Sequence, residues 1–477
     1  MSASTDIAIV GAGPSGLAAA QQLRNSGLHL TVIDEQPRPG GQFLRQPPTH
    51  YRISDWLKGR LYRSAKEMLA DVAGNERIEW CFNSTVLGIF PVSRSDEHGF
   101  DLHLQTEVGM SSLRAHRIIL ASGCREAPLP FPGWTLPGVM GAGAIQTLLK
   151  SQQVLAGERI VLAGSHPLQL IVADQILKAG GNVAAVLFAQ PWTAIFRFLR
   201  SPVLAFQNWP QLLEVGRILS RLKMAGVPIL FSRAPRKAGG GQRIERLVTN
   251  PVNASGQFIN GQERSWETDC VGVCFGFQVS SELARQSGCE TFWSPLEGGW
   301  LVRHDAWMKS TVPGIYAVGE LTGQWGADAA MEKGRIASIG ILAETGHLTS
   351  DAARANVRGP LARLKAQEDF ARTLNKVAAP PTDLALNLLN GDTVICRCEE
   401  ITLAQFDERL AGTSPIQSAD AAKLMTRAGM GLCQGRTCYP SVACRLGQKG
   451  AGRIEDLGPF HATFPIKPVP IIDFLKK

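Results

Sequence analysis

Four cysteines in the last fifth of the chain have the types and spacing of a metal-ligand set. They occur as two pairs, in VICRCEEIT and GLCQGRTCYP, and the members are Cys396, Cys398, Cys433 and Cys438. Four thiolates brought together bind either zinc or an iron–sulfur cluster. Structural zinc sites favour C-x-x-C pairs, whereas these pairs are C-x-C and C-x-x-x-x-C. The spacing therefore favours a [2Fe–2S] cluster, and zinc stays open as the alternative.

A glycine-rich loop near the start has the pattern of a dinucleotide site. The loop GAGPSG lies between a strand-like run, DIAIV, and a helix-like run, LAAAQQLRNSG. The first glycine of G-x-G-x-x-G makes the turn, the second lets the backbone approach a pyrophosphate, and the third lets the helix pack on the strand. The helix N-terminus adds N–H groups for the phosphates. The predicted contacts are Gly11, Gly13, Pro14, Ser15 and Gly16.

The next strand-like run places an acid where such a site needs one. LHLTVID ends at Asp34, and Glu35 follows. A carboxylate at this point accepts a hydrogen bond from a ribose hydroxyl. Asp34 is the predicted ribose ligand, and Glu35 is the alternative.

Two later segments indicate which dinucleotide binds. Residues 116–134, HRIILASGCREAPLPFPGW, resemble the strand and small-residue turn of flavoproteins with two dinucleotide domains. Residues 314–337, GIYAVGELTGQWGADAAMEKGRIA, resemble their closing segment, in which an acid reaches the flavin ribityl chain. That acid is normally Asp, and here it is Glu320. The resemblance implies FAD in the first domain and adds as contacts Gly41, Gln42, Ala121, Ser122, Gly123, Gly319 and Glu320.

A second strand–helix–strand pattern, over residues 158–188, has a damaged phosphate loop. Its three glycine positions hold Gly164, His166 and Gln169. Side chains at the second and third positions fill space that the pyrophosphate and the helix would need. The following strand ends in LFAQ, without an acid for a ribose or an Arg for a 2′-phosphate. We expect the fold to remain and NAD(P) binding to be lost, and a role for His166 as ligand or base stays open.

The other cysteines do not form a redox pair of the kind found in disulfide reductases. Residues 36–80 contain no cysteine, and Cys270 and Cys274 are separated by three residues in a strand-like run. We expect the six remaining cysteines to be small buried apolar residues. They are Cys81, Cys124, Cys270, Cys274, Cys289 and Cys444.

These segments predict an α/β fold with two dinucleotide-binding domains, one inserted in the other, and a small C-terminal four-cysteine domain. The FAD domain is expected in 1–140 and 291–345, with an inserted NAD(P)-like domain in 141–290. A linker or helical segment is expected in 346–390, and the [2Fe–2S] domain and tail in 391–477. The tail, FPIKPVPIIDFLKK, is a candidate for internal packing or for a partner contact.

Composition excludes several classes of function. The net charge is +8, but no run of five like charges occurs, so nucleic-acid binding is not expected. No uninterrupted apolar run approaches the ~20 residues of a membrane span. The start enters a strand without a charged leader, which favours the cytoplasm. Peripheral contact with a membrane through an electron acceptor stays open.

Three stretches together resemble a known family of electron-transfer subunits. They are DEQPRPGGQFLRQ, CREAPLPFPGWTLPGVMGAGAIQTLLK and the CRCEE…CQGRTC pair. The family is the FAD and iron–sulfur subunit of multi-subunit amino- and imino-acid dehydrogenases, such as opine oxidases, hydrogen cyanide synthase and D-hydroxyproline dehydrogenase. The α subunit of heterotetrameric sarcosine oxidase is a more distant relative.

The resemblance implies a relay rather than a complete enzyme. A partner flavoprotein β subunit similar to D-amino-acid oxidase would oxidise the C–N bond, and this chain would pass the electrons to an acceptor. The resemblance also allows an FMN at an interface and a small ferredoxin-like third subunit. No catalytic constellation is visible in the sequence. Two alternatives remain, a self-sufficient NAD(P)H-dependent reductase and a non-catalytic assembly or redox-sensing subunit.

Overall fold

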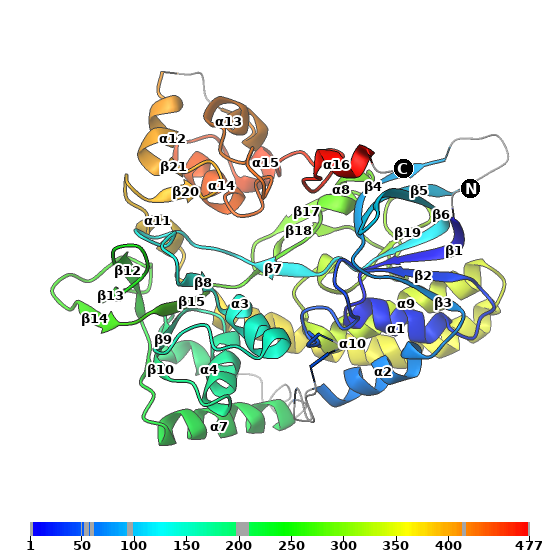
Figure 1. The fold of residues 1–477 in the computed structure, drawn as a ribbon, viewed down its shortest axis with the longest axis horizontal. Helices are drawn as coiled ribbons and strands as arrows, with labels where there is room; N and C mark the ends of the chain where they lie inside the picture. Colours follow the sequence, from blue (N-terminus) through cyan, green and yellow to red (C-terminus); the bar gives the residue numbers. More distant parts are fainter. Residues whose placement is uncertain are drawn as a thin grey trace. The chain divides into compact units, whose positions relative to one another are not determined.

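A computed structural model describes most of the chain. The chain divides into two compact units (Figure 1). The described residues are 3–48, 50–51, 57, 62–92, 99–196, 209–412 and 416–475. Unit 1 comprises 1–125, 278–372 and 461–477, and unit 2 comprises 126–277 and 373–460.

Unit 1 is built on a sheet that has seven strands among its described residues, in the order β3-β2-β1-β6-β5-β4, with β19 also paired to β6. Strand β1 lies parallel to β2 and β6, whereas β5 is antiparallel to both of its neighbours, β4 and β6. Apolar runs such as IAIV in β1 are buried on both faces, as parallel strands require. The strands are β1 (Ala3–Val10), β2 (Leu30–Ile33), β3 (Ile78–Cys81), β4 (Thr85–Pro91), β5 (Phe100–Thr106), β6 (Gly109–Leu120) and β19 (Ile315–Ala317).

Helices α1 (Pro14–Leu23) and α9 (Gly326–Glu344) pack against each other beside this sheet (Figure 1). A Cβ at Gly334 would lie 2.2 Å from the carbonyl oxygen of Ser15, so only glycine allows this approach of α9 to α1. The apolar residues of α1, α2 and α9 share one core with β1 and β2. The other elements of unit 1 are α2 (Arg63–Ala73), α8 (Glu282–Gln286), β17 (Thr291–Ser294), β18 (Gly299–Val302), η4 (Gly319–Thr322), α10 (Ser350–Ala378, whose last turn belongs to unit 2) and α16 (Ile471–Leu475).

Unit 2 contains a second parallel sheet, with strand order β11-β10-β9-β15-β8 among the residues described. Its strands are β8 (Val139–Gly141), β9 (Ile160–Gly164), β10 (Val183–Phe188), β11 (Ile229–Leu230) and β15 (Cys270–Cys274). The helices beside it are α3 (Ala142–Thr147), η2 (Leu148–Gln152), α4 (Leu168–Lys178), η3 (Trp192–Ile195) and α7 (Trp209–Met224). An antiparallel sheet follows, formed by β12 (Arg233–Gly239), β13 (Arg246–Pro251) and β14 (Arg264–Glu267).

The C-terminal part of unit 2 is a group of short elements around the four-cysteine segment. They are α11 (Leu384–Asn387), β20 (Val394–Cys396), β21 (Ile401–Thr402), α12 (Leu403–Arg409), α13 (Ala419–Thr426), α14 (Tyr439–Gln448) and α15 (Ile454–Leu457). Trp134 donates a hydrogen bond from its indole nitrogen to the carbonyl oxygen of Val394, at 2.7 Å. This bond ties the segment before Cys396 to the rest of the unit.

The unit boundaries differ from the domain limits expected from the sequence. The chain leaves unit 1 and re-enters it through β7 (Cys124–Glu126) and β16 (Phe277–Val279), which pair with each other. The segment at 346–390, expected as a linker or helix, contains the long helix α10.

The C-terminal tail packs at its start and exposes its end. The backbone N–H of Ile466 bonds to Leu87, at 2.9 Å, and the side chain of Asp473 bonds to Gln105. Internal packing thus holds for part of the tail, whereas Ile471 and Leu475 are exposed and a partner contact there stays a prediction. Among the helices described, none combines the length and the hydrophobicity that crossing a bilayer requires.

Candidate functional site

The loop after β1 has the backbone geometry of a phosphate-binding turn. Gly11 has φ +109°, and a Cβ there would lie 2.4 Å from the carbonyl oxygen of Ala121. A Cβ at Gly16 would lie 1.9 Å from the oxygen of Gly11. At Gly13 the nearest atom would be 3.9 Å away, so open space lies beside this backbone. The first and third glycines are thus required by packing, and the second leaves room for a ligand.

Helix α1 directs its N-terminus at this space. None of the described side chains caps the helix, and its first turn, with Pro14 and Ser15, contains no acid. The first N–H groups of a helix have no partner within the helix, and the helix dipole favours an anion there. An open position beside Gly13 with uncapped N–H groups fits the pyrophosphate of a dinucleotide.

The carboxylate of Asp34 lies directly beneath this loop. Its Oδ2 accepts from the backbone N–H of Ala12, at 2.6 Å, and its Oδ1 from that of Gln36, at 2.8 Å. Burial raises the pKa of Asp34, and these two hydrogen bonds act in the opposite direction. Glu35 is exposed and forms an ion pair with Lys467. Of the two acids proposed from the sequence, Asp34 is therefore the one joined to the loop.

Two other predicted segments return to the same place. The backbone N–H of Gly40 bonds to the carbonyl oxygen of Ala12, and a Cβ at Gly41 would lie 2.7 Å from the Cα of Gly13. The N–H of Ala121 bonds to the oxygen of Val10, at 2.8 Å. The segments at 40–42 and 121–123, which include Gln42, Ser122 and Gly123, therefore lie next to the glycine loop.

Gly319 and Glu320 also lie beside the loop, but the acid is already engaged. Gly319 has φ +70°, and a Cβ there would lie 2.5 Å from the hydroxyl oxygen of Ser15. The Oε1 of Glu320 accepts from the backbone N–H of Gly326, at 2.8 Å, at the start of α9. Burial raises the pKa of Glu320, although this N–H and the thiol of Cys124 act to lower it. The side chain of Glu320 thus reaches back to the N-terminus of α9.

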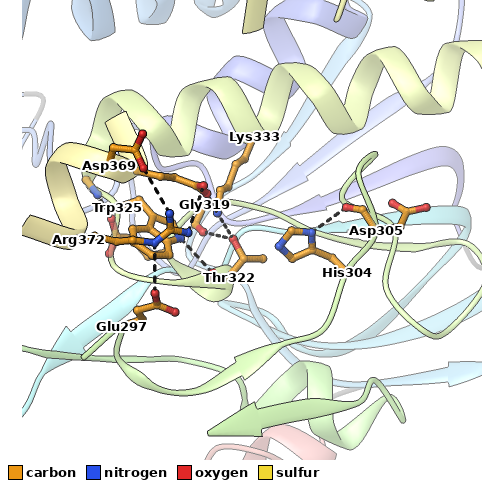
Figure 2. Close-up of polar contacts among 12 residues, drawn as sticks. Glu297, His304, Asp305, Gly319, Thr322, Trp325, Lys333, Asp369 and Arg372 are labelled. Carbon is orange, nitrogen blue, oxygen red and sulfur yellow. Dashed lines mark hydrogen bonds and ion pairs between the residues drawn. The ribbon is translucent and has the colours of Figure 1, made fainter. Parts of the chain in front are cut away.

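A cluster of polar residues around the buried Lys333 lies next to η4 (Figure 2). It was not predicted from the sequence. The Nζ of Lys333, on α9, donates to the Oγ1 of Thr322, at 2.7 Å, and lies 3.1 Å from a carboxylate oxygen of Glu368. The lysine is only 1% exposed. Its ammonium lies 5.4 Å from the ring centroid of Trp325. The run AAMEKGRIASIG also contains Glu332 and Arg335, so the sequence does not set Lys333 apart from its charged neighbours.

Arg372 and His304 complete this cluster (Figure 2). The guanidinium of Arg372 lies 5.1 Å from the ring centroid of Trp325 and 3.7 Å from a carboxylate oxygen of Glu297. Burial lowers the pKa of His304, whose Nδ1 lies 2.8 Å from the backbone oxygen of Asp305. These contacts fix the turn that carries Gly319 and Glu320.

The second nucleotide loop, in unit 2, is filled by its own side chains. The Nδ1 of His166 accepts from the backbone N–H of Leu168, at 3.1 Å, and its ring packs edge-on against Phe277. Burial lowers the pKa of His166 to about 4, so the ring is neutral at physiological pH. Gln169 is fully buried and bonds to the carbonyl oxygen of Leu187. This geometry supports the interpretation of the loop as a scaffold.

A carboxyl group that the sequence did not single out is buried near this loop. The Oε1 of Glu126 accepts from the backbone N–H of Gly143, at 2.8 Å. A Cβ at Gly141 would lie 1.9 Å from the Oε2 of Glu126, so glycine is required there. Burial raises the pKa of Glu126 to about 7, against the effect of backbone N–H groups and of the Cys274 thiol.

The four C-terminal cysteines lie in two hydrogen-bonded pairs, one member of each pair from each segment. Cys396 bonds to Cys438, and Cys398 to Cys433. A Cβ at Gly431 would lie 2.2 Å from the Cβ of Cys398, so this glycine lets the two segments meet. The Cys438 hydrogen bond, with help from backbone N–H groups, lowers the pKa of Cys396 to about 6.

The four cysteines approach one another only as two pairs. Within the described residues, no three His, Cys, Asp or Glu side chains converge closely enough to hold a metal ion as they stand. The four sulfurs nevertheless come together as pairs, and backbone N–H groups bond to Cys396 and Cys433. Such N–H···S bonds are a feature of iron–sulfur sites, where they help to set the potential.

Only three of the other six cysteines are buried as the sequence predicts. Cys270, Cys274 and Cys289 are buried, and burial raises the pKa of each. Cys81, Cys124 and Cys444 are only partly buried. Burial is therefore less complete than the sequence-based prediction, which treated all six alike.

The fold and the glycine loop define an oxidoreductase with Rossmann-type dinucleotide-binding units. Residues 5–340 match the family described as pyridine nucleotide-disulphide oxidoreductase, which supports FAD as the cofactor of unit 1. Within this class, the chain belongs to the family that includes the HcnB subunit of hydrogen cyanide synthase and the A subunit of opine oxidase. The resemblance seen in the sequence is confirmed.

Two of these relatives match nearly the whole chain, and a third matches less of it. HcnB of Pseudomonas protegens is 32% identical over 98% of this chain and 96% of its own length. The opine oxidase relative, from Rhizobium meliloti, is 31% identical over 97% of this chain and 86% of its own length. The alpha subunit of sarcosine oxidase from Corynebacterium sp. is 32% identical over 72% of this chain but only 32% of its own length.

Solved structures support the fold alone. L-proline dehydrogenase from P. horikoshii has a TM-score of 0.68 at 18% identity, over 98% of this chain and 79% of its own. Thioredoxin reductase from T. acidophilum has a TM-score of 0.53 at 18% identity, over 72% of this chain and 99% of its own.

Proposed function

We propose that this chain is the electron-transfer subunit of a multi-subunit amino- or imino-acid dehydrogenase or oxidase, with opine, D-hydroxyproline or glycine-type substrates. It would carry FAD in unit 1 and a [2Fe–2S] cluster in unit 2. The observation that carries this proposal is an open glycine loop together with four paired thiols in one chain. The relatives with near-full coverage are named as subunits of larger assemblies, which supports it.

Unit 1 would hold the dinucleotide through the residues around its loop. Gly13 and the N-terminus of α1 would accept the pyrophosphate, and Asp34 a ribose hydroxyl. Glu320 would anchor α9, and Gly41, Gln42 and the turn at 121–123 would shape the pocket. When bound, FAD would exchange two electrons and the cluster one. Together, the two groups could connect two-electron chemistry to one-electron transfer.

Cys396, Cys398, Cys433 and Cys438 would be the cluster ligands in unit 2. The filled loop at His166 leaves the inserted domain as scaffold, without NAD(P). If the rival function as a self-sufficient reductase were correct, NADH or NADPH would bleach the flavin of the purified chain under anaerobic conditions.

The substrate would be oxidised outside this chain. A flavoprotein β subunit similar to D-amino-acid oxidase would remove the electrons from the C–N bond. An FMN at an interface and a small ferredoxin-like third subunit are compatible with this assembly. We place the complex in the cytoplasm, with peripheral contact to a membrane where the acceptor is lipid-soluble.

Purification of the native complex tests this function most directly. Its subunits are identified by mass spectrometry, and flavin, iron, sulfide and zinc are quantified. Amino acids, opines and hydroxyprolines are then screened for reduction of a dye. The proposal expects FAD and two irons per chain, with dye reduction that requires the partner. A chain without flavin, or with zinc in place of iron and sulfide, would contradict it.

A further inference from the structure

Helix α7 of unit 2 is held to its neighbour α4 by one charged residue, Arg221. Arg221 forms a bidentate ion pair with the buried Asp174 of α4. Its Nε and Nη2 donate to the two carboxylate oxygens, at 2.5 and 3.0 Å. Ile218 and Leu222 are buried on the same side. The contacts that hold α7 to the unit thus combine this ion pair with two buried apolar side chains.

The outward face of α7 is apolar. Trp209, Leu212, Leu213 and Leu219 follow the spacing of one helix face and are all exposed, Trp209 by 54%. Met224 continues the apolar surface at the C-terminal end. None of the described residues covers this stripe, and Figure 1 shows α7 at the rim of unit 2. Scattered exposed leucines are normal, but a continuous stripe indicates a binding surface.

A second exposed aromatic element lies at the same edge of the sheet as the start of α7. Because α7 leads into β11, which is parallel to β10, the helix runs back from the carboxyl edge of the sheet. Its first residue, Trp209, is therefore at the edge where β10 ends and η3 begins. Trp192 is 58% exposed and packs edge-on against the exposed Phe196, with ring centroids 5.2 Å apart.

The charged side chains of α7 are three cations and one acid. Arg217 and Lys223 are exposed on α7. Glu214 is the one acid in the helix, and it is paired with Arg217 and Arg221, at 3.3 and 3.7 Å. The segment of η3 and Phe196, WTAIF, contains no acid. Tryptophan, leucine and flanking cations are the side chains that bind at the headgroup level of an anionic bilayer.

We propose that the outer face of α7, together with η3, binds an anionic lipid surface. With 16 residues and four charged side chains, α7 cannot span a bilayer, so it would lie in the plane of the headgroups. Trp192 and Trp209 would enter the interface, and Arg217 and Lys223 would contact lipid phosphates. The inference does not depend on the cofactors of the chain.

The test measures co-sedimentation of the purified holoprotein with phosphatidylcholine vesicles, with and without phosphatidylglycerol. We expect binding only to the anionic vesicles, weakened by salt. The double variant Leu213→Gln/Leu219→Gln should lower the partition coefficient by about tenfold or more. Arg217→Gln/Lys223→Gln should weaken the preference for anionic lipid. The matched control is Ile471→Gln/Phe474→Gln on α16, another exposed apolar helix, which should bind as the unchanged protein does.

Three results would overturn the proposal. They are absence of binding of the unchanged protein to anionic vesicles, undiminished binding of the α7 variants, and loss of binding in the α16 variant alone. If the α7 substitutions instead released a co-purified subunit and the complex bound no vesicles, the face would belong to a protein partner, which also overturns it. Circular dichroism and flavin and iron contents, measured on the same preparations, separate this outcome from misfolding and from failure of the proposed function.

Discussion

The carboxylate of Asp34 is hydrogen-bonded to the backbone N–H of Ala12 inside the glycine loop, at 2.6 Å. The end of β2 and the turn after β1 are therefore one structural unit. This bond fixes the loop that leaves Gly13 open, so the acid and the phosphate position cannot be displaced independently.

Gly13→Ala tests the open position. Gly13 has φ −74°, which alanine adopts, and no atom lies within 3.9 Å of the new Cβ, so stability without nucleotide should change by less than about 1 kcal/mol. The methyl group fills the pyrophosphate position, and we expect the bound FAD to fall by about tenfold or more. Flavin absorbance per chain and the midpoint of thermal unfolding check this.

The comparison for Gly13→Ala is the neighbouring loop variant Gly16→Ala. Its Cβ would meet the oxygen of Gly11 at 1.9 Å, so this variant should lose several kcal/mol of stability, about 3 or more, whether or not flavin is present. A Gly13→Ala protein with full flavin content would refute the assignment of the loop.

Asp34→Asn tests the ribose contact. The Asn oxygen can still accept from Ala12, but its NH2 group then faces the N–H of Gln36 and cannot accept that bond. The charge-assisted bond to a ribose hydroxyl is also lost, so the Kd for FAD should rise by about 10- to 100-fold. Glu35→Gln is the matched control, because Glu35 is exposed, and its Kd should change less than about threefold. Reconstitution of the apoprotein with FAD, followed by fluorescence, measures both. Equal effects of the two substitutions would contradict the choice of Asp34.

Cys433→Ser tests the cluster ligands. Loss of one thiolate of four should reduce iron and sulfide per chain severalfold and remove the optical and EPR signals of a [2Fe–2S] centre. Cys444→Ser lies in the following helix, outside the two pairs, and should leave iron unchanged. Iron retained in the Cys433 variant, or lost in both, would argue against this ligand set.

Local sequence patterns predicted much of the fold and part of the site. The expected strand, helix and strand at 158–164, 168–181 and 182–188 correspond to β9, α4 and β10, because their apolar runs and glycine stops are local signals. The glycine loop has the expected geometry for the same reason. Its relation to Asp34 follows from the order of β1 and β2.

The contacts missed are those between residues distant in sequence. The residues next to Lys333 in the sequence do not predict its contact with Glu368, which lies on another helix. The residues next to Glu126 likewise do not predict its contact with the thiol of Cys274. Periodicity predicts which face of an element is buried but not which polar partner it meets. The segment expected as a linker or helix at 346–390 shows the same point, because its contacts group most of α10 with unit 1.

Lys333→Met tests whether burial makes its ion pair important. Lys333 is 1% exposed, and its removal leaves Glu368 and Thr322 without that partner, so we expect a loss of about 2–4 kcal/mol. Lys309→Met breaks a pair of similar length, 2.8 Å to Glu344, but Lys309 is 33% exposed and the loss should stay below about 1 kcal/mol. Urea unfolding of both variants measures the difference. Similar losses would show that burial does not set the strength of the Lys333 pair.

Glu126→Gln tests the buried carboxyl group through the pH dependence of stability. The pKa of Glu126 is about 7 in the folded protein, against 4.5 as its ordinary value, because the group is buried. Between these values the folded state holds more protons than the unfolded state, so stability must fall as pH rises from 4.5 to 7. Glu126→Gln removes this loss, which amounts to at most about 3 kcal/mol. The free energy of unfolding of the variant should therefore increase relative to that of the unchanged protein as pH rises. This difference should become constant above pH 7. The exposed Glu263→Gln serves as control, and urea unfolding at a series of pH values is the measurement. Parallel pH profiles for the unchanged protein and Glu126→Gln would show that this carboxyl group titrates alike in both states.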